Sequence, residues 1–447
     1  MSAAPRLFGT DGVRGHAGEP PLDRATVRRL GAALVKALRR PAPRLLIGRD
    51  TRESGEWIER EFAYGARGCG AEVVSAGVIP TPGVAYLTRS DDFAAGVVIS
   101  ASHNPYQDNG IKVFSGTGEK FTEALEREVE GIVADPSWEV QQGEAPPVPI
   151  APITDAYLDH LRAIVAREGD AVAGLHIALD CANGATAAIA PRLFESLGCR
   201  VTAIGNAPDG RNINAGCGST HPEALAALVG RGGCALGVAF DGDGDRAIFV
   251  DERGRIVDGD AVMLMCARQM QAEGRLKGNV VVATVMSNIG LELALRESGI
   301  TLVRCQVGDK YVMEEMLKRD ASLGGEQSGH IIFSDYLFTG DGLCTALQVL
   351  KVMIATGRSL ASLASDLTAY PQVLVNVRVG KKADITTIPA IAEVIASVEE
   401  RLGGNGRLLV RYSGTEPLLR IMLEGRDERE IRGWADEIAG AVRQHLA

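Results

Sequence analysis

The sharpest chemical signal in the chain is the acidic run Asp241-Gly-Asp-Gly-Asp-Arg246. The apolar segments Leu236-Gly-Val-Ala-Phe240 and Ala247-Ile-Phe-Val250 flank it, which predicts a turn between two strands. Glycines between the acids let the backbone curl, so that three carboxylates at alternate positions can face one centre. Carboxylate oxygens suit a hard divalent cation. We therefore expect a magnesium site with the ligands Asp241, Asp243 and Asp245.

Other motifs overlap this run. An EF-hand calcium loop also alternates acids and would take Glu252 as its last ligand, but Arg246 stands where that loop needs glycine. Strands rather than helices flank the run, so we reject calcium sensing. Phosphatases of the haloacid-dehalogenase type would use Asp241 as a nucleophile, although Asp245 stands where they usually have Thr or Val. A phosphatase stays open as an alternative, whereas a solvated acidic turn would leave three repelling carboxylates without compensation.

The second signal is Ser100-Ala-Ser-His-Asn-Pro105, directly after the strand-like Ala95-Gly-Val-Val-Ile99. Asn-Pro stops a strand and forces a turn, which exposes a hydroxyl for phosphoryl transfer. Ser102 is the candidate nucleophile. We do not expect His103 to act as its base, because the side chains of adjacent residues diverge. On residue types alone, a purely structural turn is the alternative.

Two cations could assist a phosphate on that serine. Asp108-Asn-Gly-Ile-Lys112 predicts a turn into a short strand that sets Lys112 close to Ser102, and Arg14 lies in Gly9-Thr-Asp-Gly-Val-Arg-Gly15. Either could offset the charge of a phosphate, and Lys112 could act as an acid or base if its pKa were depressed. A solvated surface cation is the alternative for each.

Two glycine-rich loops could recognise a sugar phosphate. Gly324-Gly-Glu-Gln-Ser-Gly-His330 combines a carboxylate, an amide, a hydroxyl and an imidazole, a mixture that suits neighbouring sugar hydroxyls. Arg411-Tyr-Ser-Gly-Thr-Glu-Pro417 offers backbone N–H groups, hydroxyls and a guanidinium fork, which together can cradle an anion. The second loop lacks a Walker lysine and a following helix, so a sugar phosphate fits it better than a nucleotide. An ordinary hairpin turn is its alternative.

Three segments with the order strand, helix, strand must position these loops, at residues 44–74, 176–202 and 280–304. Such alternation predicts parallel sheets with right-handed crossovers, and we expect three α/β domains rather than one large sheet. The Pro-rich stretch 142–149 predicts a linker. The last part predicts a smaller α+β domain with strands at 372–379, 407–412 and 418–423 and helices at 388–402 and 428–445. The expected domains are 1–150, 151–252, 253–368 and 369–447.

Composition excludes several classes of protein. The 447 residues include 47 Lys plus Arg against 57 Asp plus Glu, and a formal net charge of −10 argues against a nucleic-acid-binding surface. No apolar run approaches the roughly 18 residues that a membrane helix needs, and the first residues lack a signal peptide's apolar stretch. We expect a cytoplasmic protein with neither a nucleic-acid nor a membrane partner. The eight cysteines, without any C-x-x-C pair, predict reduced and mostly buried thiols.

Taken together and in this order, the motifs resemble those of the α-D-phosphohexomutase superfamily over essentially the whole chain. The resemblance implies three related α/β domains and a smaller C-terminal α+β domain around a central cleft. It implies that Ser102 carries a transferable phosphoryl group, which completes the magnesium site. It also implies a small-molecule sugar phosphate as the substrate.

The same resemblance assigns further residues. Those that hold the sugar hydroxyls are Glu326 and Ser328. Those that bind the non-reacting phosphate are Arg411, Ser413, Gly414 and Thr415. Those near the reacting groups, among which the acid and base stay open, are Arg14, Lys112, Arg246 and His330.

Two details are most similar to the branch that interconverts glucosamine 6-phosphate and glucosamine 1-phosphate for cell-wall precursors. They are the starting motif 8–15 and Val307-Gly-Asp-Lys-Tyr-Val312. Glucose and mannose members typically place a Gly-His pair near Gly308-Asp309 and Met at Gln327, and Asp309 could favour a substrate ammonium. The resemblance further implies a sugar bisphosphate intermediate, a primer of glucosamine 1,6-bisphosphate or glucose 1,6-bisphosphate, and a homodimer. A phosphoglucomutase or phosphomannomutase is the alternative within the family.

Overall fold

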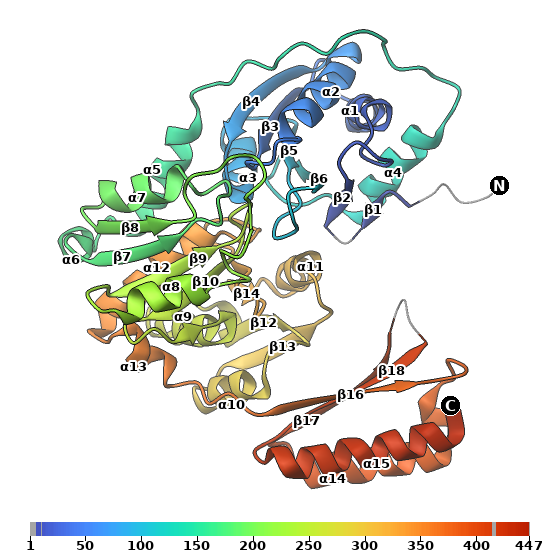
Figure 1. Ribbon diagram of the computed structural model, residues 1–447, viewed down its shortest axis with the longest axis vertical. Helices are drawn as coiled ribbons and strands as arrows, with labels where there is room; N and C mark the ends of the chain where they lie inside the picture. Colours follow the sequence, from blue (N-terminus) through green and yellow to red (C-terminus); the bar gives the residue numbers. More distant parts are fainter. Residues whose placement is uncertain (1–5, 10, 414–416, 447) are drawn as a thin grey trace. The chain divides into compact units, whose positions relative to one another are not determined.

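The computed structural model describes residues 6–9, 11–413 and 417–446, which form two compact units (Figure 1). One unit takes in residues up to 286 with 302–365, and the other takes in 287–301 with the residues from 366 onward. The first holds most of three successive α/β segments, and the second holds a smaller α+β segment. This order of segments confirms the expected fold class. The domain boundaries proposed from the sequence stay predictions.

The first α/β segment carries a six-stranded sheet in the order β1-β2-β6-β5-β3-β4. β3 pairs in parallel with β4 and β5, whereas β6 pairs antiparallel with β5 and β2. The elements of this segment are β1 (Phe8–Gly9), β2 (Gly12–His16), α1 (Arg24–Leu38), β3 (Arg44–Arg49), α2 (Gly55–Gly68), β4 (Glu72–Val78), α3 (Thr81–Ser90), β5 (Ala95–Ile99), β6 (Asp108–Ser115) and α4 (Glu123–Ala134).

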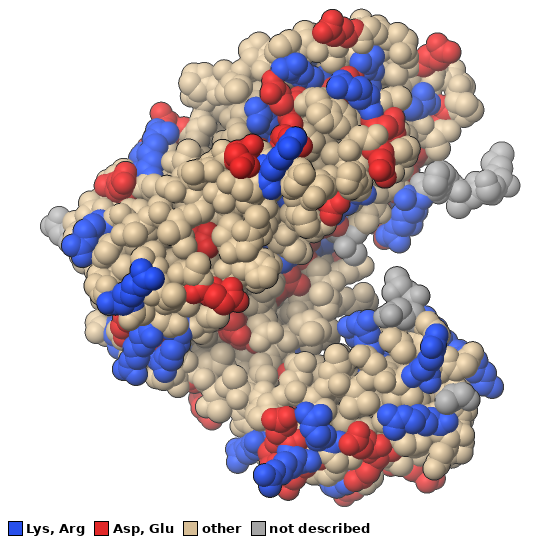
Figure 2. Space-filling view, in the orientation of Figure 1, with Lys and Arg blue, Asp and Glu red and all other residues tan. Residues whose placement is uncertain are grey.

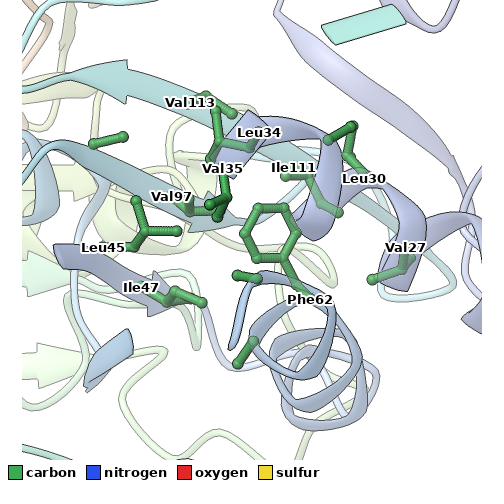
Figure 3. Close-up of a cluster of buried hydrophobic side chains, with 14 of the residues drawn as sticks. Val27, Leu30, Leu34, Val35, Leu45, Ile47, Phe62, Val97, Ile111 and Val113 are labelled. Carbon is green, nitrogen blue, oxygen red and sulfur yellow. The ribbon is translucent and has the colours of Figure 1, made fainter. Parts of the chain in front are cut away.

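Helices α1 and α2 pack on this sheet around Phe62, which lies among aliphatic side chains of α1, β3, β5 and β6 (Figure 3). α1 begins at Asp23, whose carboxylate accepts hydrogen bonds from two N–H groups of the first turn. Glycine lets the two helices approach closely, because a Cβ on Gly65 would lie 1.8 Å from the carbonyl oxygen of Arg28. This packed core fixes β5 and β6, and the loop between them contains Ser102.

The second segment carries a five-stranded sheet in the order β11-β10-β9-β7-β8. β7 pairs in parallel with β8 and β9, whereas β9 and β10 are antiparallel. Its elements are α5 (Thr154–Ile164), α6 (Gly169–Val172), β7 (His176–Asp180), α7 (Ile189–Ser196), β8 (Arg200–Ile204), α8 (Glu223–Gly230), β9 (Leu236–Phe240), β10 (Ala247–Asp251) and β11 (Ile256–Val257).

The third segment has the sheet order β13-β12-β14-β15, with β12 and β14 parallel and β14 and β15 antiparallel. Its elements are α9 (Gly259–Ala272), the 3-10 helix η1 (Lys277–Asn279), β12 (Val280–Thr284), α10 (Ile289–Glu297), β13 (Thr301–Cys305), α11 (Asp309–Arg319), β14 (Leu323–Gly325), β15 (Ile331–Phe333), α12 (Gly342–Thr356) and α13 (Leu360–Ala364).

The sheets are mixed, so the prediction of parallel sheets is wrong at one edge of each. The loop with Ser102 joins antiparallel β5 and β6, the acidic run joins β9 and β10, and the loop that starts at Glu326 joins β14 and β15. Connections this short can join only antiparallel strands, because a parallel crossover needs about a dozen residues or more. Each α/β segment therefore presents its polar motif on a hairpin loop held at both ends by paired strands.

The C-terminal segment is a sheet in the order β16-β18-β17, antiparallel throughout, packed against α14 and α15. The order of its elements confirms the strand, helix, strand, strand, helix prediction. These elements are β16 (Gln372–Arg378), the 3-10 helix η2 (Ile385–Thr387), α14 (Pro389–Leu402), β17 (Arg407–Tyr412), β18 (Leu418–Glu424) and α15 (Glu428–Leu446). The N-terminus of α10 belongs to the same unit, since the backbone N–H of Ile289 donates to Glu424 Oε2 at 3.1 Å.

The surface and the cysteines agree with the composition. Basic and acidic residues are interspersed on the face shown in Figure 2. Every cysteine is a free thiol and most are buried, which confirms that prediction. None of the described helices combines the length and the apolar character of a membrane span.

Candidate active site

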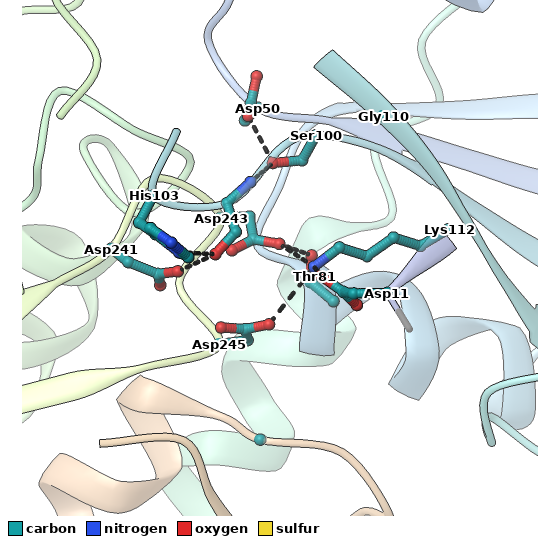
Figure 4. A network of polar contacts seen from close by, with 12 residues as sticks. Asp11, Asp50, Thr81, Ser100, His103, Gly110, Lys112, Asp241, Asp243 and Asp245 are labelled. Carbon is teal, nitrogen blue, oxygen red and sulfur yellow. Dashed lines mark hydrogen bonds and ion pairs between the residues drawn. The ribbon is translucent and has the colours of Figure 1, made fainter. Parts of the chain in front are cut away.

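Ser102 lies on the loop between β5 and β6 with a left-handed backbone, at φ 51°. Its N–H donates to Ser100 Oγ at 2.9 Å, and that hydroxyl donates to Asp50 Oδ2 at 2.5 Å (Figure 4). The Ser102 hydroxyl donates to Asp241 Oδ2 at 2.5 Å, across the boundary between the first two α/β segments. The structure thus brings the predicted nucleophile against the predicted metal site.

His103 corrects one expectation. Its Nδ1 lies 3.4 Å from Ser102 Oγ, so the two adjacent side chains converge instead of diverging. The prediction rested on the usual divergence of adjacent side chains, whereas the left-handed conformation of Ser102 changes the direction of successive side chains. Burial, together with the charges of Arg246 and Arg14, lowers the pKa of His103, so the ring is neutral at neutral pH.

The three acids of the run converge on one centre. One carboxylate oxygen from each of Asp241, Asp243 and Asp245 lies within 4.8 Å of the others, and all three residues are buried. Burial and the charges of Asp245 and Asp243 raise the pKa of Asp241 well above its usual range. Burial acts in the same direction on Asp243, but the charge of Lys112 and the hydrogen bonds from Lys112 and Thr81 together outweigh it and lower that pKa.

This donor set fits a divalent cation. Asp243 Oδ1 and Asp245 Oδ1 are buried without a hydrogen-bond partner among the described residues, which is costly for carboxylate oxygens unless a cation binds them. A hard cation such as Mg²⁺ takes carboxylate oxygens as ligands. A second group that could hold a metal ion is Asp245 with Asp309 and His330.

Lys112 lies at the centre of the acidic cluster. Its Nζ is 2.9 Å from Asp243 Oδ2, 3.0 Å from Asp11 Oδ2 and 3.5 Å from Asp245 Oδ2. Burial disfavours the ammonium, but Asp11, Asp243 and Asp245 raise the pKa of Lys112 well above its ordinary value. The condition for an acid or base role, a depressed pKa, is therefore not met in this geometry. Lys112 is a fixed positive charge.

Thr81, at the start of α3, fixes the orientation of Asp243. Its hydroxyl donates to Asp243 Oδ2 at 2.7 Å, and its backbone N–H donates to the Asp243 carbonyl at 2.8 Å. Residues that hold a metal ligand in place typically affect metal affinity by about 10–100-fold. We expect Thr81→Val to weaken Mg²⁺ binding by about that factor, measured by calorimetric titration. Thr88→Val on the same helix, whose hydroxyl donates only to the Val84 carbonyl, should leave it unchanged; equal losses would contradict the prediction.

A chain of alternating charges extends from the acidic cluster. Asp11 contacts Lys112 and, through Oδ1, Lys120 Nζ at 2.6 Å, and Lys120 contacts Asp309 of the third segment. Burial opposes ionisation of Asp309, but the charge of Lys120 lowers its pKa, so the pair is ionised. Asp309 is thus already paired with an ammonium of the protein, and the geometry does not support its suggested pairing with a substrate amine.

A cavity of about 490 Å³ lies beside this chain in the first unit. Its lining includes four predicted site residues, namely Arg14, Arg246, Asp309 and Glu326, and also His103 and Asp11. Glu326 Oε1 accepts a hydrogen bond from the Gly308 N–H at 3.1 Å. This space between ionisable groups of all three α/β segments is of a size that suits a small polar ligand.

Two other predicted residues of the Glu326 loop lie outside the lining of this cavity. Ser328 is exposed at the loop, and His330 is buried with its Nε2 accepting from the Gly340 N–H at 3.2 Å. The same Nε2 is 3.7 Å from Asp309 Oδ2. The roles of Ser328 and His330 stay predictions.

The predicted phosphate loop lies in the second unit. Ser413 is buried, its N–H donates to the Leu418 carbonyl at 2.8 Å, and Lys382 Nζ donates to its carbonyl at 2.6 Å. Arg411 is exposed on β17, opposite Arg420 of β18. Gly414 and Thr415 lie outside the described residues.

Sequence reasoning missed several of these groups. Asp11 lies in the same motif as Arg14, residues 9–15, but only the arginine was predicted as a site residue. Thr81, Lys120 and Lys382 are isolated polar residues that no local pattern marks.

Comparisons with known proteins bear on the whole chain. Family models described as phosphoglucomutase/phosphomannomutase alpha/beta/alpha domains I, II and III match residues 5–139, 155–254 and 258–370. The model of the C-terminal domain of the same family matches residues 374–441. The phosphoglucosamine mutase of Solibacter usitatus is 49% identical over 447 residues, covering 98% of this chain and 99% of that protein. That of Syntrophotalea carbinolica is 49% identical over 448 residues, covering 99% and 98%.

Solved structures show the same fold. A phosphoglucomutase/phosphomannomutase family protein from Burkholderia thailandensis has a TM-score of 0.79 at 23% identity, covering 98% of this chain and 97% of that chain. The N-acetylphosphoglucosamine mutase of Aspergillus fumigatus, solved with GlcNAc-6P and magnesium, has a TM-score of 0.66 at 18% identity, covering 98% and 95%. Because the relatives match at nearly half identity over almost the full length, and all four domain models match in order, the chain belongs to the phosphoglucomutase/phosphomannomutase family, the α-D-phosphohexomutase superfamily that its motifs resemble, and is an isomerase.

Proposed function

We propose that this protein interconverts glucosamine 6-phosphate and glucosamine 1-phosphate through a phosphoserine at Ser102 and a sugar 1,6-bisphosphate. The observation that carries the proposal is the contact of 2.5 Å between Ser102 Oγ and Asp241 Oδ2, at a loop whose next residue, His103, lines a cavity that admits a small ligand. The relatives named phosphoglucosamine mutase support the choice of substrate. The product would feed amino-sugar nucleotide and cell-wall precursor synthesis.

The reaction begins with phosphorylated Ser102. A sugar hydroxyl attacks the phosphorus, its proton passes to a base, and the bond from phosphorus to Ser102 Oγ breaks as the new ester bond forms. The ring of His103, 3.4 Å from that oxygen and on the cavity wall, is placed to take part in proton transfer. The bisphosphate then reorients and returns its other phosphoryl group to Ser102, and the proton returns to the new sugar hydroxyl.

The residues of this chain keep the phosphoryl group in place. A phosphoserine carries about −1.5 to −2 charges. Lys112, Arg14 and Arg246 supply permanent positive charge close to it. We propose Mg²⁺ as the ion held by Asp241, Asp243 and Asp245, where it would withdraw charge from the phosphoryl oxygens. A trace of glucosamine 1,6-bisphosphate or glucose 1,6-bisphosphate would charge Ser102 initially, and a homodimer stays a prediction.

Phosphorus NMR under competition tests this proposal. The purified protein with Mg²⁺ and a trace of sugar bisphosphate receives equimolar glucosamine 6-phosphate, glucose 6-phosphate and mannose 6-phosphate. We expect the signal of glucosamine 1-phosphate to grow much faster than the other two. A faster signal from glucose or mannose 1-phosphate would contradict the substrate but leave the mutase reaction intact. Free phosphate alone would instead support a phosphatase.

A further inference from the structure

Arg52 is the largest fully buried side chain described, and it contacts the Ser102 loop without being part of the cavity lining. It lies between β3 and α2, and its guanidinium uses all three nitrogens. Nε donates to Asp50 Oδ2 at 2.9 Å. The two terminal nitrogens donate to four backbone carbonyls, those of Ser102 at 3.0 Å, Asn104 at 2.8 Å, Asp108 at 2.9 Å and Pro105.

A comparison within the chain separates this arrangement from ordinary turn formation. Asp50 directly follows β3, and Asp180 is the last residue of β7, the equivalent strand of the second segment. Each carboxylate accepts a hydrogen bond at 3.0 Å from the backbone N–H two residues later. In the second segment that later residue is Ala182, and the turn forms without a guanidinium. The turn therefore does not require Arg52. The Arg52 side chain adds hydrogen bonds to the carbonyls of the Ser102 loop.

Asn214 of the second segment reinforces the same carbonyls. Its Nδ2 donates to the carbonyl of Ser102 at 2.9 Å and to that of Asn104 at 3.1 Å. Two side chains from different segments thus converge on the backbone of the nucleophile. Ser102 sits in a left-handed conformation that a residue other than glycine adopts at a cost, so surrounding contacts must hold it there.

We propose that Arg52, together with Asn214, is a positioning residue for phosphoryl transfer, which holds the backbone of Ser102 so that its Oγ faces the buried acids. Neither side chain touches the cavity or the reacting oxygen in the described contacts, so both act through the loop. The inference rests on the proposed function and deepens it. It predicts that loss of either residue lowers the rate of transfer and leaves substrate binding unchanged.

The experiment compares Arg52→Lys, Arg52→Ala and the control Arg49→Ala in the full-length protein. Lysine keeps the charge opposite Asp50 but has no planar fork to reach four carbonyls. We expect kcat of Arg52→Lys to fall about 100-fold with KM unchanged, as for a displaced reacting group. Millimolar guanidinium should restore part of the lost kcat in Arg52→Ala. Arg49→Ala, which loses only an ion pair of 3.1 Å with Glu59, should keep its kcat.

Asn214→Asp keeps the test valid if neither Arg52 variant folds. It replaces the donor of both hydrogen bonds to the loop by an acceptor at a half-buried position, and we expect kcat to fall by about tenfold or more with KM unchanged. A wild-type kcat in folded Arg52→Lys would overturn the inference. If that variant does not fold, a wild-type kcat in Asn214→Asp would overturn it. A loss of kcat in Arg49→Ala equal to that in the Arg52 variants would also overturn it. A wild-type protein that never forms a phosphoserine would instead contradict the proposed function itself.

Discussion

Replacing Ser102 by alanine is expected to abolish transfer between sugar phosphates, with kcat falling by about 10⁴–10⁶-fold, the usual range for loss of a nucleophile. The hydroxyl contacts Asp241 directly, and alanine leaves no oxygen to carry the phosphoryl group. The fall would be measured by phosphorus NMR of the sugar phosphates. Ser115→Ala is the matched control, because that serine ends β6 and its hydroxyl, in the described contacts, bonds only to Thr117 of the following turn.

Labelled phosphate transferred from a sugar phosphate to the protein distinguishes this mechanism from the phosphatase alternative. Phosphate on Ser102 should survive mild hydroxylamine, whereas an acyl phosphate on Asp241 would be lost. Release of the label, or normal turnover by Ser102→Ala, would contradict the role of this serine.

Replacing Lys112 by methionine should have the largest effect on stability. The change leaves the buried carboxylates of Asp243 and Asp245 and the half-buried carboxylate of Asp11 without the ammonium that lies among them. Breaking a buried ion pair from one side typically costs about 3–5 kcal/mol, and we expect that loss in the free energy of unfolding without Mg²⁺. Urea denaturation would measure it. Added Mg²⁺ should recover part of the loss, because an ion that binds only the folded state stabilises it.

Lys318→Met provides the control for loss of a lysine in general. Lys318 forms an exposed pair with Glu315 on α11, and such surface pairs contribute under about 1 kcal/mol. A loss in Lys112→Met no larger than that of this control would show that Lys112 does not neutralise the cluster. The same result would weaken the assignment of the acids as a metal site.

The site loops could be predicted from the sequence because each concentrates several polar residue types within a few positions between apolar strands. The turns at the acidic run and at Ser102 could be predicted locally, since glycine or proline restricts the backbone there. Thr81 could not be predicted in this way, because it reaches Asp243 from 162 positions earlier in the chain. The roles of Arg52 and Lys120 could not be predicted either, since an isolated cation in a sequence gives no sign that it will be buried.

The direction of the strands was mispredicted for a related reason. Alternation of strands and helices correctly indicates the parallel pairing within the α/β segments. It does not describe the strand that follows each polar loop without an intervening helix. The length of those connections, short in every segment, carried the missing information, because only antiparallel strands can be joined so closely.

The hairpin loops also have a consequence for how the protein folds. Each loop closes between strands that are neighbours in sequence, so its local contact order is low and it can form early within its own segment. The contacts that assemble the site are distant, with 139 positions between Ser102 and Asp241 and 131 between Lys112 and Asp243. Individual segments can therefore acquire native loops before any of them is competent for catalysis. Formation of the contact between Ser102 and Asp241 during refolding would report the docking of segments, a later event than the folding of each one.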